Sequence, residues 1–467
     1  MNRLLISAAH KSSGKTTVCI GLCAALRARG AVVQPFKKGP DYIDPLWLGL
    51  AAGRPCYNLD PYLSGAEEIR AEFARRMHGA SLGLVEGNKG LYDGLDLDGS
   101  NSNAALAALI GAPVVLVIDA RGMTRGIAPL ILGYQAFDAN IRIAGVILNQ
   151  LGGARHEAKL RAVIRHYTGV PVLGAVQHDE RMAIVERHLG LVPSNETDSA
   201  RACVDEIAAR IAAQVDLDEV LAVARQAGPL GTAEPISNAR CGPSVRVGIA
   251  RDAAFGFYYP GDLEALRAAG AELVAFDALH DAHLPPVDGL FIGGGFPETH
   301  MDTLAANSSL RAELRAAIDA GLPAYAECGG LMYLARGIEW NGRRAEMVGV
   351  VPADIVMHAR PVGRGYVHLR ETGRGLWPAP QAGEAALIRA HEFHYSSVEN
   401  LAPGVEFAYE VERGHGIDGR HDGIVHKNLL ASYAHLRDVR GNPWARRFVD
   451  FVRSCHHAAG LEHRLTP

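Results

Sequence analysis

The sequence lacks the features that would direct this protein to a membrane or to nucleic acid. No apolar run approaches the ~20 residues that span a bilayer. The 47 Lys and Arg residues are outnumbered by 51 Asp and Glu residues, and the net charge of −4 gives no basic surface for nucleic acid or anionic lipid. The N-terminus leads directly into an expected strand and loop, so we expect no signal peptide. These absences favour a cytoplasmic, soluble protein.

The chain also lacks a disulfide framework. It has seven cysteines, an odd number, and no Cys-x-x-Cys pair. Reduced thiols in the cytoplasm are the interpretation that fits this usage. Cys19 and Cys23 lie four residues apart on an expected helix, a spacing that could hold a metal. Small apolar side chains on a packed helix face are the better explanation for this pair.

The first half of the chain alternates short apolar runs with helical segments. Such runs are typical of a parallel sheet that is covered on both faces. A helix is expected over residues 18–29, where an apolar stripe ends at Gly30. The sequence therefore predicts a doubly wound α/β domain to about residue 190, followed by helices to about residue 225. The expected strands are 4–7, 31–36, 82–86, 114–119, 144–149 and 172–176.

A second α/β pattern begins after a segment rich in proline and glycine. That segment, residues 228–244, has no periodicity and is interpreted as a linker. The predicted organisation is a first α/β domain over 1–227, the linker, a second α/β domain over 245–455, and a C-terminal tail over 456–467. Within the second domain the expected strands are 245–250, 273–276, 289–292 and 324–326, and the expected helices are 262–269 and 310–320.

The segment from Ala9 to Thr16 reads as a phosphate-binding loop between a strand and a helix. Backbone N–H groups and the helix N-terminus would bind phosphate oxygens. Lys15 would neutralise phosphate charge, and the Thr16 hydroxyl would hold Mg²⁺. The first glycine of the strict motif is replaced by Ala9, and a purely structural loop is the alternative. The predicted ATP-binding residues are Ser12, Ser13, Gly14, Lys15, Thr16, Thr17 and, at the adenine, Asn149.

Acidic residues recur where the following strands end, the edge at which such sheets bind ligands. Mg²⁺ coupled to phosphates needs only one or two carboxylates. We expect at least two of the acidic residues to serve the metal or the acceptor. The predicted metal site consists of Thr16, Asp44 and Glu86. Some of the acidic residues could instead be turn residues, since Asp44 precedes Pro45 and Asp93 precedes Gly94; Asn149 could be a turn residue as well. The acidic candidates are Asp41, Asp44, Glu86, Asp93 and Asp119, of which Asp41 and Asp93 are placed at the acceptor.

A second chemical centre is predicted around Cys328. Apolar residues lead into this cysteine, and two glycines and a helical segment follow, which is the pattern of a nucleophile elbow. The helix N-terminus favours the thiolate. Among 20 histidines, His435 is the best candidate for the base, because it follows a strand late in the domain. Backbone N–H groups at Gly294 and Gly295 could form an oxyanion hole or merely a flexible loop.

A zinc site was considered at His391 and His394. The pair fails the HExxH spacing, because residue 395 is Tyr, and we do not favour a metal there.

The motifs described above, in the order in which they follow one another along the chain, resemble those of the cobyrinate a,c-diamide synthase family. The resemblance implies an N-terminal domain similar to dethiobiotin synthetase and a C-terminal class I-like glutaminase. It implies that Cys328 is the glutaminase nucleophile and His435 its base. The acidic third member of other class I glutaminases is not expected, since no Pro-x-Glu follows His435. The matching segments are 36–44, 86–94, 186–191, 293–298, 327–331, 391–396 and 432–435.

The implied activity is that of a carbon–nitrogen ligase in cobalamin biosynthesis. ATP with Mg²⁺ would activate the a- and c-acetate carboxylates of a cobyrinate-type tetrapyrrole as acyl phosphates. Cys328 would release ammonia from L-glutamine, and a sheltered route would carry it to the acyl phosphate. A homodimer is left open.

Two alternatives remain at this stage. Asn88 and Lys89 depart from the family pattern. Together with Lys38 they form a pattern similar to that of relatives that amidate siroheme or sirohydrochlorin, so these compounds are alternative acceptors. Nickel-sirohydrochlorin, which other relatives amidate, is a third alternative. From another class, a phosphate-loop ATPase switch would explain residues 1–190 but would leave Cys328 unused.

Overall fold

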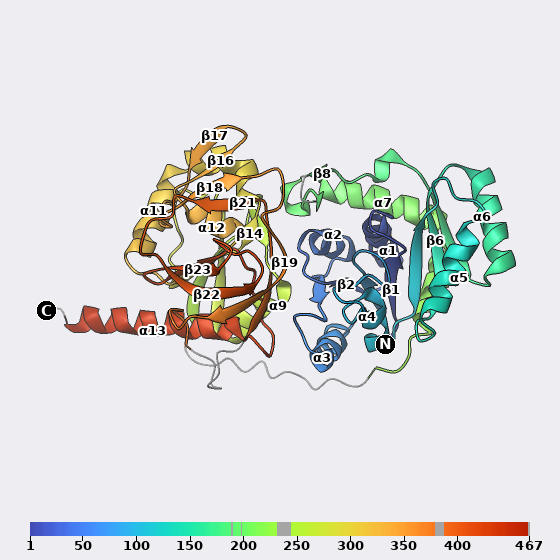
Figure 1. The fold of residues 1–467 in the computed structure, drawn as a ribbon, viewed down its shortest axis with the longest axis horizontal. Helices are drawn as coiled ribbons and strands as arrows, with labels where there is room; N and C mark the ends of the chain where they lie inside the picture. The colour runs from blue at the N-terminus through green and yellow to red at the C-terminus, as the bar shows by residue number, and fades with distance from the viewer. Residues whose placement is uncertain (188–189, 198, 231–243, 379–386, 466–467) are drawn as a thin grey trace. The chain divides into compact units, whose positions relative to one another are not determined.

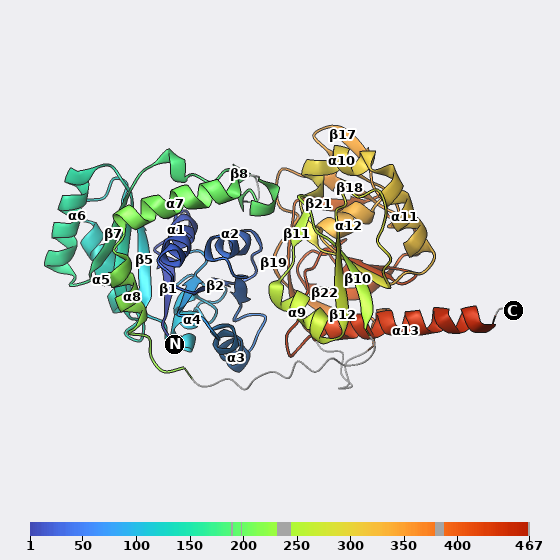
Figure 2. The same ribbon diagram turned by 180° about the vertical axis from the view of Figure 1, so that it is seen from behind.

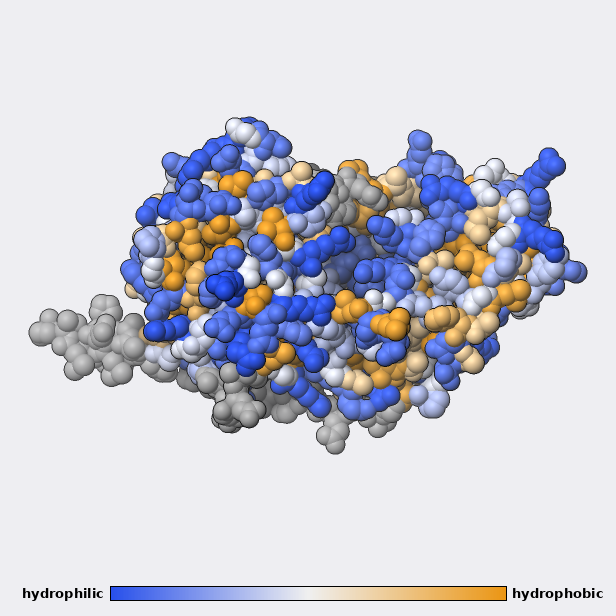
Figure 3. Space-filling model, viewed as in Figure 1, coloured by the Kyte–Doolittle hydropathy of each residue, from blue (hydrophilic) through white to orange (hydrophobic). Residues whose placement is uncertain are grey.

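The computed structural model describes residues 1–187, 190–197, 199–230, 244–378 and 387–465. The chain forms two compact units, Met1–Ile236 and Ser237–Pro467, called here the N-terminal and C-terminal units (Figure 1). Most of the segment expected to be a linker, 228–244, lies outside the described residues. Among the described helices, none combines the length and the apolar character that crossing a bilayer requires. On the face drawn in Figure 3, hydrophilic side chains separate small hydrophobic patches.

The N-terminal unit is built on a seven-stranded sheet in which every neighbouring pair of strands is parallel. The strand order is β3-β2-β4-β1-β5-β6-β7, so β1 lies at the centre and the chain winds outward in both directions. The strands are β1 (Arg3–Ala8), β2 (Val33–Lys38), β3 (Tyr57–Leu59), β4 (Leu82–Glu86), β5 (Val114–Asp119), β6 (Ile143–Leu151) and β7 (Val172–Gln177).

Helices cover both faces of this sheet, as the alternation of buried side chains along each strand requires. Leu4 and Ile6 of β1 pack with α1, α2, α7 and α8. Leu5, between them, packs with α3, α4, α5 and α6 on the opposite face. Figures 1 and 2 show these layers from both sides. The helices are α1 (Lys15–Ala28), α2 (Ile43–Ala52), α3 (Ala66–Arg76), α4 (Asn103–Ile110), α5 (Ile127–Phe137), α6 (Ala154–Tyr167), α7 (Ala200–Gln214) and α8 (Leu217–Ala224).

A short excursion follows β7 and contributes to the site described below. It contains the 3-10 helices η1 (Glu180–Met182) and η2 (Ser194–Glu196) and a two-stranded ribbon, β8 (Glu186–Arg187) and β9 (Gly190–Leu191). The doubly wound architecture expected from the sequence is confirmed for this unit.

The C-terminal unit has a nine-stranded mixed sheet, in the order β12-β10-β13-β15-β24-β23-β22-β19-β20. The first five strands are parallel, and the last four continue the sheet antiparallel. The strands are β10 (Val245–Ala250), β12 (Ala271–Phe276), β13 (Gly289–Ile292), β15 (Ala324–Glu327), β19 (Gly363–Glu371), β20 (Ile388–His394), β22 (Glu406–Arg413), β23 (His421–His426) and β24 (Leu429–Ser432).

Smaller sheets and helices complete this unit. On one face, α10, α11 and α12 pack against Leu290 and Ile292 of β13. On the other face, α9 and α13 pack against Phe291, again by strand alternation. The helices are α9 (Pro260–Ala268), η3 (Pro297–His300), α10 (Met301–Ala306), α11 (Ser308–Asp319), α12 (Gly329–Leu334) and α13 (Trp444–Leu465). The small sheets contain β11 (Phe255–Phe257) with β14 (Gly294–Gly295), and β16 (Gly337–Trp340), β17 (Arg343–Glu346), β18 (Asp354–Met357) and β21 (Ser396–Glu399).

Candidate active sites

The loop between β1 and α1 has the backbone of an anion-binding loop. Ser12 and Gly14 adopt left-handed φ angles of 62° and 80°, and Gly14 is the N-cap of α1. Asn149, at the end of β6, donates from Nδ2 to the Ser13 carbonyl oxygen at 2.9 Å and so holds the loop against the sheet. A Cβ atom on Gly14 would lie 2.2 Å from that Nδ2, which explains the glycine. Loop N–H groups and the start of α1 are thereby directed toward the same space.

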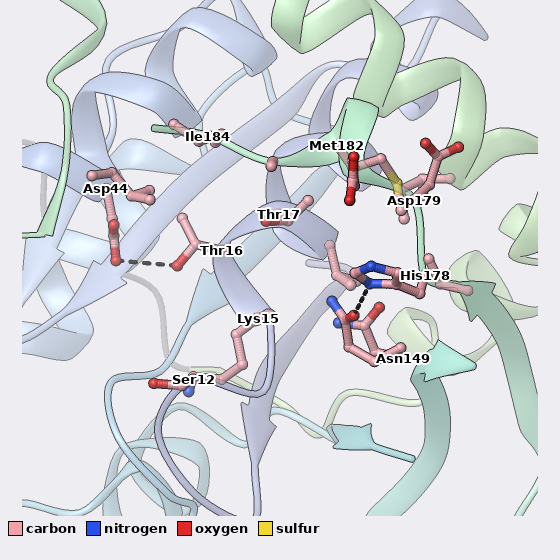
Figure 4. A pocket seen from close by; sticks show the side chains of 18 of the residues that line it. Ser12, Lys15, Thr16, Thr17, Asp44, Asn149, His178, Asp179, Met182 and Ile184 are labelled. Carbon is pink, nitrogen blue, oxygen red and sulfur yellow. Dashed lines mark hydrogen bonds between the residues drawn. The ribbon is translucent and has the colours of Figure 1, made fainter. Parts of the chain in front are cut away.

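A cavity of about 580 Å³ opens at this loop (Figure 4). Its polar end is formed by the loop and the start of α1, and its less polar end by the segment that follows β7. Asn149 and His178 lie between the two ends, and His178 Nδ1 is 2.6 Å from Gln150 Oε1. The polar lining includes Ser12, Gly14, Lys15, Thr16, Thr17, Asp41 and Asp44, and the apolar lining includes Val176, Met182, Ala183, Ile184 and Leu191.

Three carboxylates and one lysine meet beside this cavity. Thr16 Oγ1 donates to Glu86 Oε1 at 2.6 Å and is 3.3 Å from Asp44 Oδ2. Lys37 Nζ forms ion pairs with Asp44, with Glu86 Oε1 at 3.0 Å and with Asp41 Oδ2 at 3.7 Å. Burial raises the pKa of Glu86 against the opposing effect of Lys37. Burial, reinforced by Asp44, raises the pKa of Asp41 to about 7. The structure thus brings Thr16, Asp44 and Glu86 together, and it places Asp41, which was predicted at the acceptor, beside the same lysine.

Lys37 was not predicted as a site residue. It is the last residue but one of β2 and is almost fully buried, so its charge is available to the three carboxylates rather than to solvent. The strand expected from the sequence, 31–36, ends directly before Lys37, so this lysine was not placed inside the sheet. Burial lowers the pKa of Lys15, while Glu86 acts in the opposite sense.

The donor atoms at this cluster fit a hard divalent cation such as Mg²⁺. Thr16, Asp44 and Glu86 present hydroxyl and carboxylate oxygens, the ligand type that Mg²⁺ prefers. Glu86 Oε2 is buried without a hydrogen-bond partner, so one ligand oxygen is free. Within the described ranges, no three His, Cys, Asp or Glu residues are grouped so that they could hold a metal by themselves. Such an ion would need further oxygens from a phosphate.

Two of the predicted acidic residues are engaged locally. Asp93 Oδ2 accepts the N–H of Gly90 at 2.9 Å within its own loop. Asp119 pairs with Arg121, two residues away. Asn103, at the start of α4, donates from Nδ2 to the Gly90 carbonyl oxygen at 2.9 Å and so holds the loop after β4. Asp93 therefore shapes the loop near Glu86 and is not part of the Lys37 cluster.

Cys328 sits at a sharp turn between β15 and α12, as expected of a nucleophile elbow. Its φ of 47° and ψ of −101° lie outside the favoured regions for a residue with a side chain. The Cys328 N–H donates to the Ser432 carbonyl at 2.7 Å, which ties the elbow to β24. A Cβ on Gly330 would lie 2.2 Å from the Ile292 carbonyl oxygen, so the turn packs too closely against β13 for a larger residue. The strained turn presents the thiol at the N-terminus of α12.

His435 follows β24 and lies within hydrogen-bonding reach of the Cys328 side chain. Its other neighbour is the residue before the cysteine: Glu327 Oε2 is 3.5 Å from His435 Nδ1. Burial opposes the charge on this imidazole, but the contacts with Cys328 and Glu327 outweigh it and raise the pKa of His435 to about 10. Cys328 and His435, which were predicted to act together, are 107 positions apart in the sequence but lie close together in the structure. Glu327, an acid that was not predicted, lies beside His435.

The two predicted oxyanion-hole glycines lie beside this pair. A Cβ on Gly294 would be 2.7 Å from His435 Cε1, and a Cβ on Gly329 would be 2.9 Å from the backbone nitrogen of Gly295. Gly294 thus allows close approach of the imidazole. The Gly295 nitrogen lies next to the residue that follows the nucleophile, where an oxyanion is commonly bound.

His391 and His394, considered above as metal ligands, have other surroundings. The His391 ring stacks on His435, with centroids 4.9 Å apart. The His394 ring stacks on Tyr433 at 3.7 Å. Burial lowers the pKa of His391 well below its usual value, and His435 adds to the effect, so this ring is neutral. Both residues pack around the segment that carries His435. Cys19 and Cys23 lie in the hydrophobic core of the N-terminal unit.

Comparison with known proteins identifies both halves of the chain. Residues 5–192 match the family described as the CobQ/CobB/MinD/ParA nucleotide binding domain. Residues 246–440 match the CobB/CobQ-like glutamine amidotransferase domain. Near the full length, the chain is 48% identical to a cobyrinate a,c-diamide synthase of Magnetococcus marinus, with 97% of each chain covered. It is 41% identical to a cobyrinate a,c-diamide synthase of Methanosarcina acetivorans, over 96% of this chain and 95% of the relative. Since the similarity runs through both units, the chain belongs to the cobyrinate a,c-diamide synthase family.

Proposed function

We propose that the protein is a cobyrinate a,c-diamide synthase, which amidates the a- and c-acetate carboxylates of cobyrinate with ATP and L-glutamine. The observation that carries the proposal is the presence, in one chain, of a phosphate-loop cavity and a Cys–His pair at an elbow. Relatives that carry this name cover almost the whole chain. We assign the ATP-dependent step to residues 1–227 and glutamine hydrolysis to residues 245–455, with Ser12, Ser13, Gly14 and Thr17 as phosphate contacts.

The first step activates a carboxylate, which is otherwise a poor electrophile. A carboxylate oxygen of the acceptor attacks the γ-phosphorus of ATP, the bond to the β–γ bridging oxygen breaks, and ADP leaves. Lys15 neutralises charge on the phosphates, and the adenine lies toward Asn149 and the apolar end of the cavity. Thr16, Asp44 and Glu86 would hold Mg²⁺, which supplies charge neutralisation at the phosphates. Lys37 limits repulsion among the carboxylates, and Asp41 and Asp93 lie on the acceptor side.

The second step releases ammonia from glutamine. The Cys328 thiolate attacks the amide carbon. The charge that develops on the carbonyl oxygen is stabilised by the N–H group of Gly295, which was predicted, with the N–H group of Gly329 in place of the predicted Gly294. His435, which carries the proton lost by the thiol, gives it to the departing nitrogen. A water molecule, deprotonated by His435, then hydrolyses the thioester to glutamate. Ammonia attacks the acyl phosphate, and inorganic phosphate leaves as the amide forms.

An acceptor panel tests the proposal. Purified protein is incubated with ATP, Mg²⁺, glutamine and one acceptor at a time, and each product is read by mass for one or two carboxyl-to-amide changes. The acceptors are cobyrinate, sirohydrochlorin, siroheme and nickel-sirohydrochlorin. Two amidations of cobyrinate, with the others unchanged, are expected. Amidation of a sirohydrochlorin-type acceptor instead would reassign the substrate, and glutamine-independent ATP hydrolysis alone would contradict the ligase function.

A further inference from the structure

A buried carboxylate lies directly beside the nucleophile. Glu327 is the last residue of β15 and is 3% exposed. Its Oε1 accepts two hydrogen bonds, from the Tyr325 hydroxyl at 2.6 Å and from the Leu436 N–H at 2.9 Å. These bonds fix one carboxylate oxygen. The other, Oε2, is directed to His435 Nδ1 at 3.5 Å. A carboxylate held in this way on a buried imidazole is the arrangement that orients catalytic histidines.

The backbone explains how adjacent residues reach the same ring. In an extended strand, neighbouring side chains point to opposite faces, and Glu327 shares its face with Tyr325. Cys328 leaves the strand with a φ of 47°, which turns its side chain away from the alternation. The strained elbow therefore allows both Glu327 and Cys328 to approach His435, although they are consecutive in sequence.

The other ionisable groups around His435 have different partners. His391 stacks on the ring and lies 3.5 Å from the Tyr259 hydroxyl through its own Nδ1. Asp422, a second buried carboxylate, accepts the N–H groups of Tyr433 and Ala434 and fixes the turn before His435. Arg437 pairs with Asp262. Glu327 is a buried carboxylate that the structure places 3.5 Å from the His435 imidazole.

We propose that Glu327 is a positioning residue that completes a Cys328–His435–Glu327 triad. This inference rests on the glutaminase function proposed above. Glu327 Oε2 accepts the Nδ1–H of His435, which leaves Nε2 to face the thiol. When Cys328 ionises, its proton moves from Sγ to Nε2, and Glu327 stabilises the imidazolium that results. The acid thus comes from the residue before the nucleophile, and not from a segment after the histidine.

The test compares Glu327→Gln with wild type in the full-length enzyme. The substitution keeps the shape of the side chain and removes its charge. We expect kcat for glutamine hydrolysis to fall about 100-fold, with KM for glutamine changed less than about threefold. The rate at which iodoacetamide alkylates Cys328 at neutral pH should fall as well, because fewer imidazolium–thiolate pairs form. Glu327→Asp, which restores the charge, should recover part of both rates.

A matched control is available in the same unit. Glu392 is also buried, and its Oε2 is 3.6 Å from His394 Nε2, but the ring of His394 stacks on Tyr433 and not on His435. Glu392→Gln should leave the pH profile of glutamine hydrolysis unchanged. Far-UV circular dichroism and the thermal unfolding midpoint report whether each variant is folded. Amidation with free ammonia, which needs only the cavity of the N-terminal unit, should persist in Glu327→Gln.

The outcomes separate this inference from the proposed function. If wild-type protein hydrolyses glutamine and Glu327→Gln matches its kcat and alkylation rate, the triad is refuted while the glutaminase stands. If Glu327→Gln does not fold, the folded Glu327→Asp variant decides. A partial loss of kcat that the rate of Cys328 alkylation follows supports the triad, whereas wild-type values of both, or a loss of kcat without a loss of alkylation rate, refute it. If wild type itself cannot hydrolyse glutamine, the proposed function fails first.

Discussion

Replacing Gly294 by alanine should disable the glutaminase while leaving the rest of the enzyme intact. The new Cβ would lie 2.7 Å from His435 Cε1 and 3.3 Å from the Phe257 Cβ. Carbon atoms in contact normally stay about 3.5 Å apart or more, so the imidazole must move by roughly 0.8 Å. A displacement of about 1 Å at a catalytic group costs on the order of 100-fold in rate. We therefore expect glutamine-dependent amidation to fall about 100-fold.

The assay measures amide formation with glutamine and, separately, with a high concentration of an ammonium salt. Ammonia-dependent amidation should stay within about twofold of wild type, because the phosphate-loop cavity is formed by the N-terminal unit alone. Gly441→Ala is the matched control, since a Cβ there would meet no atom within 4 Å. It should keep both activities. A folded Gly294→Ala variant with wild-type glutamine-dependent activity would refute the placement of His435 against this glycine.

Three further predictions concern single groups. Lys15→Ala should remove amidation with both nitrogen sources, and a product formed with ammonia in mass analysis would contradict its role at the phosphates. Lys37→Met leaves buried carboxylates without their cation and should lower the free energy of unfolding by about 3 kcal/mol in urea titrations; unchanged stability would argue against the cluster. Since the pKa of His435 is raised to about 10 from 6.5, its contribution to stability is complete below about pH 6.5 and is lost as pH rises toward 10. The stability difference between wild type and His435→Gln should therefore shrink over that interval, and a difference that grows would contradict the assignment.

The sequence predicts the parallel part of both units well. Buried strands without polar alternation, such as Val114–Asp119 and Gly289–Ile292, have the same bounds in the structure as in the prediction. Strand β3 was missed because Tyr57–Leu59 is only three residues long. The antiparallel strands β19 to β23 were not predicted. Burial along β20 and β23 does not follow a two-residue alternation, so these strands lack the pattern by which a half-buried strand is recognised.

The site could be predicted where its chemistry is contiguous in sequence. Gly14, Lys15 and Thr16 form one loop, and Cys328 is marked by its own glycines. The contact of Glu327 with His435 could not be foreseen, because it depends on the pairing of β15 with β24 and on the strained turn at Cys328. Sequence reasoning looked for an acid after His435, whereas the structure brings one from the strand that carries the nucleophile.

The most direct test of the account compares the two nitrogen sources in Cys328→Ala, with cobyrinate, ATP and Mg²⁺ present and amide formation measured by mass. The account predicts that glutamine-dependent amidation is abolished while ammonia-dependent amidation continues near the wild-type rate, because the thiol supplies ammonia and takes no part in forming the amide bond. Glutamine-dependent amidation that survives in this variant, or a folded variant that has lost both activities, would contradict the division of labour between the two sites.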